Sequence, residues 1–169
     1  MADCKVLVVM GSDSDFPVME GCFKMLNKFG VGFKATVASA HRTPDKAMSL
    51  ARGAEAEGFK VIIAAAGLAA HLGGVLAANT ALPVIGVPCK GGALAGVDAL
   101  YATVQMPTGI PVATVAIDGG SNAAILACQI LALSDKGLAD ALKEYKKSLA
   151  SSVAARDARL KQKIADMDK

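Results

Sequence analysis

The sequence predicts an α/β fold in which a parallel sheet of five strands has helices on both of its faces. Short apolar segments recur along the chain, each long enough for one buried strand. Each is followed by a segment that favours a helix, and Gly, Pro, Ser or Asp residues separate the two kinds of segment. Strands and helices that alternate in this way are typical of parallel sheets with right-handed connections.

The five strands are predicted at residues 5–10, 33–38, 60–65, 83–87 and 111–116. The first helix follows a cap at Ser14 or Asp15 and ends at Gly30. The second has Thr43 as its cap and Pro44 as its first residue, and ends near residue 58. The next helices are predicted at residues 72–79 and 94–104, and from the glycine-rich residues 118–122 to about residue 133.

A last helix is predicted at residues 138–164, because apolar residues keep helical spacing there: Leu138, Leu142, Tyr145, Leu149 and Val153. This helix is longer than a five-stranded core needs, so we expect it to pack on a neighbouring subunit. No linker or repeat divides residues 1–169, and this length fits a single domain.

The composition predicts a large subunit interface rather than a membrane segment. Apolar residues make up 53% of the chain and its mean hydropathy is +0.44, which is high for a soluble monomer. Residues 61–78 carry no charge over a length that could span a membrane. Gly67, the pair Gly73 and Gly74, His71 and a β-branched start favour a buried strand instead.

Charge and cysteine patterns exclude other classes of protein. A net charge of +3 is too small to indicate nucleic-acid binding, and its excess lies in residues 143–169, where acidic residues are interleaved. Cys4, Cys22, Cys89 and Cys128 lack metal-ligand spacing. Because no secretory signal stands at the N-terminus, we expect reduced thiols in a cytoplasmic protein.

Polar side chains directly follow three of the predicted strands. They lie in Gly-Ser-Asp-Ser-Asp at 11–15, Ser-Ala-His-Arg-Thr-Pro at 39–44 and Ala-Gly-Leu-Ala-Ala-His-Leu at 66–72. The carboxyl ends of parallel strands meet at one edge, where open α/β folds bind ligands. Both histidines of the chain are therefore predicted to share one crevice. The loop at 90–92 would lie on the same edge, whereas residues 106–109 would lie at the opposite one.

The segment at 11–15 suits a phosphate or a sugar. Its glycine, its serine hydroxyls and a helix N-terminus offer donors to a phosphate, and its aspartate suits ribose hydroxyls. The alternative is that these residues only cap the helix. The segment matches neither the Gly-Lys-Ser/Thr loop of ATP-binding proteins nor the Gly-x-Gly-x-x-Gly loop of dinucleotide-binding proteins, so ATP and NAD are not supported.

Acid–base chemistry is predicted at His41. An imidazole exchanges protons near neutral pH, and the adjacent Arg42 can hold an anion with two parallel hydrogen bonds. The alternative for His41 is a structural hydrogen bond, and for His71 it is a satisfied histidine in an apolar setting. Two histidines without a carboxylate pair make a poor metal site, and the chain lacks the nucleophile elbow of a Ser-His-Asp triad.

Four motifs resemble those of a known family. They are Gly-Ser-x-Ser-Asp at 11–15, Ser-Ala-His-Arg-Thr-Pro at 39–44, Ala-Ala-His-Leu at 69–72 and Gln-Met-Pro-x-Gly-Ile-Pro at 105–111, in order within a match from about Val6 to Leu133. In these motifs the chain is similar to the class I 5-(carboxyamino)imidazole ribonucleotide mutases of bacterial purine biosynthesis. The hexapeptide around His41 is the most specific of the four.

The resemblance implies a flavodoxin-like, three-layer αβα sandwich that assembles as a homo-octamer with active sites at subunit interfaces. It implies an isomerase that moves a carboxylate from the exocyclic nitrogen to carbon 4 of an aminoimidazole ribonucleotide, without metal, ATP or another cofactor. His41 would be the general acid and base. The binding residues would be Ser12 and Arg42 for the phosphate, Asp15 for the ribose, Ser39 in the same pocket, and Gly67, Ala70, His71 and Leu72 around the migrating carboxylate.

The chain departs from the family pattern at Leu68, where glycine is frequent, and at Gly73, where proline is frequent. Two alternative functions stay open. One is a class II carboxylase, which adds free carbon dioxide to the aminoimidazole but typically has lysine in place of Arg42 and lacks the segment around His71. The other is a non-catalytic, flavodoxin-like nucleotide-binding module, although the first three loops lack aromatic residues that could sandwich a flavin.

Overall fold

The computed structural model describes residues 4–167. Its centre is one sheet of five parallel strands in the order β2-β1-β3-β4-β5. The strands are β1 (Cys4–Met10), β2 (Gly32–Val37), β3 (Val61–Gly67), β4 (Val84–Cys89) and β5 (Ala113–Thr114). This strand order is that of a flavodoxin-like fold, which confirms the predicted fold class.

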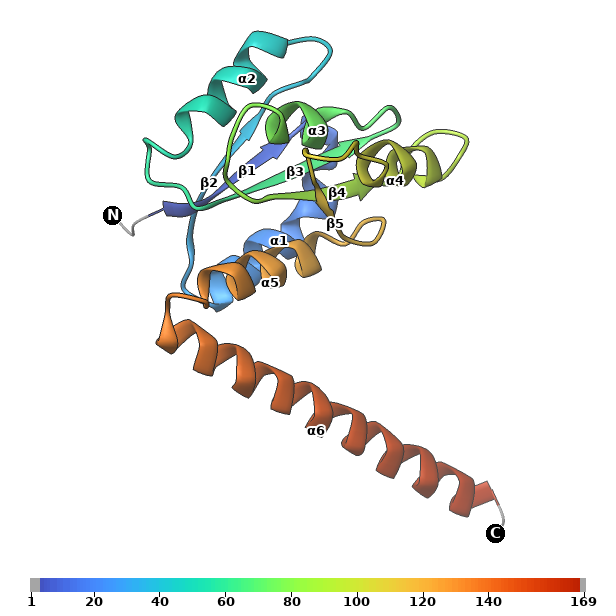
Figure 1. Cartoon of the computed structure of the whole chain (residues 1–169). Coiled ribbons are helices and arrows are strands. Elements are labelled where there is room, and N and C mark those ends of the chain that lie inside the picture. The colour runs from blue at the N-terminus through green and yellow to red at the C-terminus, as the bar shows by residue number, and fades with distance from the viewer. Residues whose placement is uncertain (1–3, 168–169) are drawn as a thin grey trace. The chain divides into compact units, whose positions relative to one another are not determined.

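The helices form two layers, one on each face of the sheet (Figure 1). On one face lie α1 (Phe16–Lys28) and α5 (Gly120–Leu131), and on the other lie α2 (Pro44–Gly53), α3 (Leu72–Ala77) and α4 (Val97–Val104). A short 3-10 turn, η1 (Asp13–Asp15), leads into α1. Because all strands are parallel, the loops that leave their carboxyl ends gather at one edge.

The central strands are the most buried part of the chain. Val6 and Val8 of β1 and Val61, Ile62 and Ile63 of β3 are fully buried. A sheet covered on both faces buries consecutive residues rather than alternate ones, which explains the uncharged run 61–78. As predicted, that run forms a strand, a loop and a short helix. Within residues 4–167, no helix is both long and apolar enough to cross a membrane.

Helices α2 and α4 and strand β5 are shorter than predicted. Helix α2 ends at Gly53, and turns over residues 54–58 follow it up to Gly58, at φ +93°. Helix α4 begins three residues later than predicted, because Ala95 (φ +51°) and Gly96 (φ +90°) have left-handed backbones that a right-handed helix excludes. Strand β5 is short, because it pairs with β4 at only two positions and Pro111 lacks the N–H that pairing needs.

Residues 132–167 form a separate unit built on α6 (Lys136–Met167). Ion pairs one turn apart stabilise this helix, for example Lys136 with Asp140 at 3.0 Å. Exposed apolar side chains recur along it at Leu149, Val153, Leu160 and Ile164. Steps of four, seven and four residues place these side chains on one face of the helix.

Candidate active site

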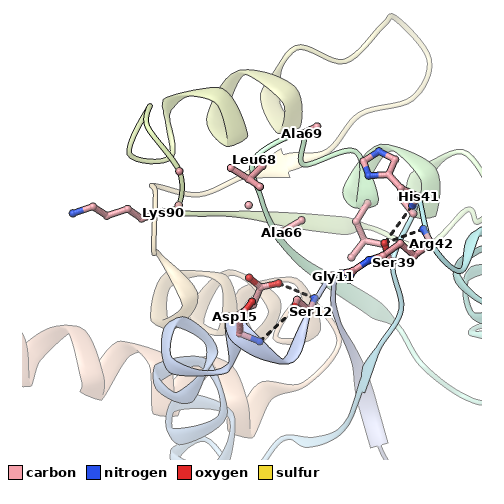
Figure 2. Close-up of a pocket in the computed structure, with 16 residues that line it drawn as sticks. Gly11, Ser12, Asp15, Ser39, His41, Arg42, Ala66, Leu68, Ala69 and Lys90 are labelled. Atoms are coloured by element: carbon pink, nitrogen blue, oxygen red, sulfur yellow. Dashed lines mark hydrogen bonds between the residues drawn. The ribbon is translucent and has the colours of Figure 1, made fainter.

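A pocket of about 680 Å³ lies at the carboxyl ends of the strands, where the polar segments were expected to meet. This volume suits a ligand the size of a nucleotide. Its walls come from the loops after β1, β2, β3 and β4, and Figure 2 shows their side chains. The lining residues are Gly11, Ser12, Ser14, Asp15, Ser39, Ala40, His41, Arg42, Ala66, Gly67, Leu68, Ala69, Leu72, Lys90, Gly91 and Gly92.

The pocket brings together seven of the nine site residues predicted from the sequence: Ser12, Asp15, Ser39, His41, Arg42, Gly67 and Leu72. The other two, Ala70 and His71, are not among the lining residues. Ala70 is buried, and its N–H donates to the Leu68 carbonyl at 2.8 Å. His71 reaches the site through a hydrogen bond to His41.

Ser12 organises the loop after β1. Its N–H donates to Asp15 Oδ2 at 3.0 Å, and its Oγ accepts from the N–H of Ser14 at 3.3 Å. These reciprocal bonds form a capping box that starts η1. Asp15 occupies the N-cap position of α1, as predicted, but its side chain makes no capping bond to that helix. The side-chain cap lies earlier, at Ser12, because a 3-10 turn precedes α1.

Asp15 is a buried carboxylate, only 9% exposed. Burial raises its pKa above the ordinary value because water no longer stabilises the charged form, and the backbone N–H groups of Ser12 and Gly11 offset this only in part. Nearby Asp13 raises the pKa further through charge repulsion. The carboxylate still accepts several hydrogen bonds, so it suits the hydroxyl donors of a sugar.

Replacing Asp15 by Asn is expected to stabilise the free protein at neutral pH. The raised pKa means that ionisation costs more in the folded chain than in the unfolded chain, so above both pKa values the carboxylate destabilises the fold. An uncharged amide removes this cost. The gain should shrink as the pH falls through the titration of Asp15, because the native side chain then becomes neutral as well.

Thermal unfolding of both proteins between about pH 4 and pH 7 measures this difference. Glu55→Gln, at an exposed turn position, is the matched control and should show no comparable trend. A difference between Asp15→Asn and the native protein that is constant with pH, or that grows as the pH falls, would contradict the burial effect.

Ser39 organises the loop after β2. Its Oγ accepts from the N–H groups of His41, at 3.3 Å, and Arg42, at 3.1 Å. Its backbone N–H donates to Thr43 Oγ1 at 2.9 Å, and Thr43 Oγ1 donates to the Ser39 carbonyl at 3.2 Å. Thr43 precedes Pro44 at the start of α2 as predicted, but its side chain makes no capping bond, because its hydroxyl is used by Ser39.

His41 and His71 form a direct pair. Nε2 of His41 lies 2.9 Å from Nδ1 of His71, and the two rings meet edge to face with centroids 5.0 Å apart. One of the two nitrogens must carry the hydrogen and the other must accept it. The bond leaves Nδ1 of His41 and Nε2 of His71 as the nitrogens not engaged in it. The two histidines are thus held together as one hydrogen-bonded pair.

The loop after β3 approaches the neighbouring strand closely. A Cβ on Gly67 would lie 3.2 Å from the carbonyl oxygen of Cys89, so a larger residue would require the backbone of β4 to move by a few tenths of an ångström. Leu72 opens α3 from a buried position at the pocket wall. Small and apolar groups therefore form this side of the pocket.

Lys90 lines the pocket, in the loop at 90–92 that was expected on this edge, although the family resemblance implies no role for it. Its N–H donates to Asp118 Oδ1 at 2.7 Å, which ties the loop after β4 to the loop before α5. Figure 2 shows its side chain extending away from the other labelled residues. The sequence feature that indicated a place for Lys90 in the site is its position directly after the fourth strand, on the ligand-binding edge.

Buried thiols make poor nucleophiles in this protein. Burial raises the pKa of Cys22 and of Cys89 to about 12 and that of Cys128 to about 11, and the carboxylates of Asp15 and Asp118 add to the rise at Cys89. A thiol protonated at neutral pH is unreactive. Among the residues that the structure describes, no three His, Cys, Asp or Glu side chains gather as metal ligands would.

Known proteins resemble this chain over most of its length. A family model described as AIR carboxylase matches residues 5–152. The N5-carboxyaminoimidazole ribonucleotide mutase of Pyrococcus horikoshii is 50% identical over 155 residues, which cover 92% of this chain and 88% of that protein. The mutase of the same name from Thermotoga maritima is 49% identical over 158 residues, which cover 94% and 92%.

A fungal protein matches over a smaller share of its own length. Phosphoribosylaminoimidazole carboxylase of Schizosaccharomyces pombe is 53% identical over 138 residues, which are 82% of this chain but 25% of that protein. The crystal structure of Treponema denticola PurE has a TM-score of 0.83 and 33% identity, covering 92% of this chain and 97% of that one. By its match to the family model and its identity to these relatives, the chain belongs to the AIR carboxylase family.

Proposed function

We propose that this protein isomerises 5-(carboxyamino)imidazole ribonucleotide to 4-carboxy-5-aminoimidazole ribonucleotide, a step of purine biosynthesis. The family and the names of the Pyrococcus and Thermotoga relatives support this reaction. The observation that carries the proposal is the His41–His71 pair at the rim of a pocket that also holds Arg42 and the buried Asp15. Each group matches one part of the substrate. The histidine pair can exchange protons with the reacting imidazole, Arg42 can bind the phosphate, and Asp15 can bind the ribose.

Four polar side chains are proposed to hold the ribose phosphate. Arg42 offers two parallel N–H donors to the phosphate, and Ser12 adds a hydroxyl. Asp15 is proposed to accept from the ribose hydroxyls. Ser39 keeps its one hydroxyl proton for the ligand, because its oxygen already accepts from two N–H groups.

His41 is proposed to serve both halves of the reaction. As an imidazolium it donates a proton to the exocyclic nitrogen of the carbamate while the nitrogen–carbon bond breaks, which leaves an amine and carbon dioxide. Carbon 4 of the ring then bonds to carbon dioxide and carries both a hydrogen and the new carboxylate. The neutral His41 removes that hydrogen as a proton, so the ring regains its aromaticity and His41 regains its starting state.

His71 is proposed to act through His41 rather than on the substrate. When His71 Nδ1 accepts the hydrogen of His41 Nε2, Nδ1 of His41 is left to exchange a proton with the substrate. The imidazolium form of His41 then keeps an acceptor for its Nε2–H. This pairing holds the ring in one tautomer and one orientation through the two proton transfers.

The loop after β3 is proposed to enclose the migrating carboxylate. Gly67 and Leu72 supply small and apolar walls, and the buried Ala70 supports the turn between them. Such walls exclude water and suit carbon dioxide, which is small and neutral. Holding carbon dioxide next to carbon 4 replaces a bimolecular encounter by a step within one complex.

Substrate preference tests this proposal. The purified protein should convert the carbamate nucleotide rapidly and should carboxylate aminoimidazole ribonucleotide with bicarbonate only weakly. The name of the Schizosaccharomyces relative favours a second reaction, direct carboxylation of aminoimidazole ribonucleotide. A preference for aminoimidazole ribonucleotide and carbon dioxide would establish that second reaction, and binding without either conversion would leave a nucleotide-binding module.

We further propose that the protein works as a homo-octamer, as the family resemblance implies, and that it works in the cytoplasm, where its cysteines would stay reduced. Two exposed apolar faces support an oligomer. One consists of Leu94, Val97, Tyr101 and Val104, on α4 and the loop before it. The other is the apolar face of α6 described above, where Val153 is 62% exposed. Exposed apolar surface of this extent is typical of protein interfaces.

Removing residues 143–169 is expected to reduce the size of the assembly, because the exposed apolar face of α6 is lost with them. Light scattering on the native and shortened proteins measures the change in mass. A full-length variant with Leu149→Ser and Val153→Ser separates the apolar face from the length of the helix and should act in the same direction. Unaltered mass in both variants would refute an interface role for α6.

A further inference from the structure

Leu68 has a costly backbone conformation and an exposed side chain. Its φ is +54°, in the left-handed region that glycine adopts readily and leucine rarely. Its side chain is 55% exposed, so burial does not compensate for the backbone. Residues held in such conformations cluster at binding sites, where the surrounding structure maintains them.

The turn that contains Leu68 does not itself require a leucine. The N–H groups of Ala70 and His71 donate to the carbonyls of Leu68 and Ala69, each at 2.8 Å. These backbone bonds set the path of the chain towards His71. Glycine would form the same bonds without steric strain. The side chain of Leu68 is therefore the feature that needs an explanation.

That side chain bridges two loops at the rim of the pocket. A Cβ on Gly92 would lie only 2.6 Å from Leu68 Cδ2, so Leu68 lies in space that a side chain at position 92 would take. Both residues line the pocket. Figure 2 shows Leu68 on the side of Ala66 that is away from Asp15. The Leu68 side chain thus extends from the loop after β3 to the loop after β4, across from the proposed ribose site.

We propose that the Leu68 side chain acts as a gate: it closes one side of the pocket and so retains carbon dioxide between the two halves of the reaction. This inference rests on the isomerisation proposed above, in which carbon dioxide is free inside the pocket for a short time. Escape of carbon dioxide and entry of dissolved carbon dioxide both compete with its capture by carbon 4. A leucine across this side of the pocket slows both exchanges and excludes water, whereas a glycine would leave the path open.

Isotope exchange during turnover tests the gate. The carbamate nucleotide is supplied unlabelled in buffer that contains 13C-bicarbonate and carbonic anhydrase, and mass spectrometry measures the 13C in the product carboxylate at early conversion. The native protein should incorporate little label. Leu68→Gly should incorporate at least about fivefold more per turnover and should release more aminoimidazole ribonucleotide. Leu68→Met, which keeps an apolar side chain of similar volume, should retain carbon dioxide nearly as well as leucine.

Ala95→Gly is the matched control, because it removes the same kind of backbone strain (φ +51°) at an exposed residue that does not line the pocket. Both glycine variants should unfold at or above the native temperature, and only Leu68→Gly should gain label. The gate would be overturned if the native protein and Leu68→Gly incorporated the same amount of 13C, or if Leu68→Gly and Leu68→Met gained the same amount. A smaller assembly in Leu68→Gly would also overturn it. If the native protein does not convert the carbamate nucleotide at all, the proposed isomerisation itself has failed.

Discussion

Replacing His41 by Asn is expected to lower kcat by about 100-fold or more, the usual contribution of a positioned acid–base group. Asparagine keeps a polar group near the position of the imidazole Nδ1, but it cannot exchange a proton and is too short to replace the Nε2 contact with His71. Binding of the product nucleotide should change little, because phosphate and ribose contacts are proposed at other residues. Single-turnover kinetics and titration calorimetry measure the two quantities separately.

The partner variant His71→Ala, which removes the acceptor for His41 Nε2–H, distinguishes a catalytic role from a positioning role. If His71 acts through His41, its loss should reduce kcat less than the loss of His41 and should shift the pH profile of the remaining activity. A structural role alone would lower stability and leave that profile unchanged. Full activity in a correctly folded His41→Asn protein would refute the assignment of His41 as the acid and base.

Replacing Arg42 by Ala is expected to weaken nucleotide binding by about 10- to 100-fold. Hydrogen bonds to a charged group contribute about 1.5–3 kcal/mol, and about 1.4 kcal/mol corresponds to a factor of ten. Because Arg42 is proposed to hold the phosphate rather than the reacting atoms, kcat at saturating substrate should fall much less than affinity. Calorimetry with the product nucleotide at two salt concentrations measures the loss and its electrostatic part.

Two further variants sharpen the test of Arg42. Arg42→Lys keeps the charge but loses the paired donors, so its affinity should lie between those of the native protein and Arg42→Ala. Arg156→Ala removes an exposed cation from α6 and should leave affinity unchanged. A dissociation constant for Arg42→Ala that equals the native value would exclude the proposed phosphate contact.

Local signals explain why most of the fold could be predicted. Valine and isoleucine at Val6, Val61 and Ile63 mark buried strands, and Pro44 marks a helix start. These signals act over a few residues, so they are visible in a single sequence. Boundaries that depend on backbone conformation, such as the late start of α4 after Ala95, have no comparable local signal because alanine rarely adopts a positive φ.

The gathering of the site at one edge also follows from the sequence, since parallel strands bring their carboxyl ends together. Seven of the nine predicted residues line one pocket for this reason. Individual contacts do not follow in the same way. The side-chain cap at Ser12, ahead of the N-cap position at Asp15, and the use of the Thr43 hydroxyl by Ser39 depend on the backbone angles of a few loop residues.

By itself, the sequence determined the fold class and the ligand-binding edge, and it predicted there the histidine proposed for proton transfer and the arginine proposed for the phosphate. Only the tertiary structure decided that His71 bonds to His41 rather than lining the pocket, that Asp15 is buried, and that Leu68 lies against Gly92. The physical reason is the distance along the chain over which each kind of signal acts. Strand and helix signals arise between neighbours in the chain, whereas His41 and His71, thirty residues apart, meet only after β1, β2 and β3 have packed side by side.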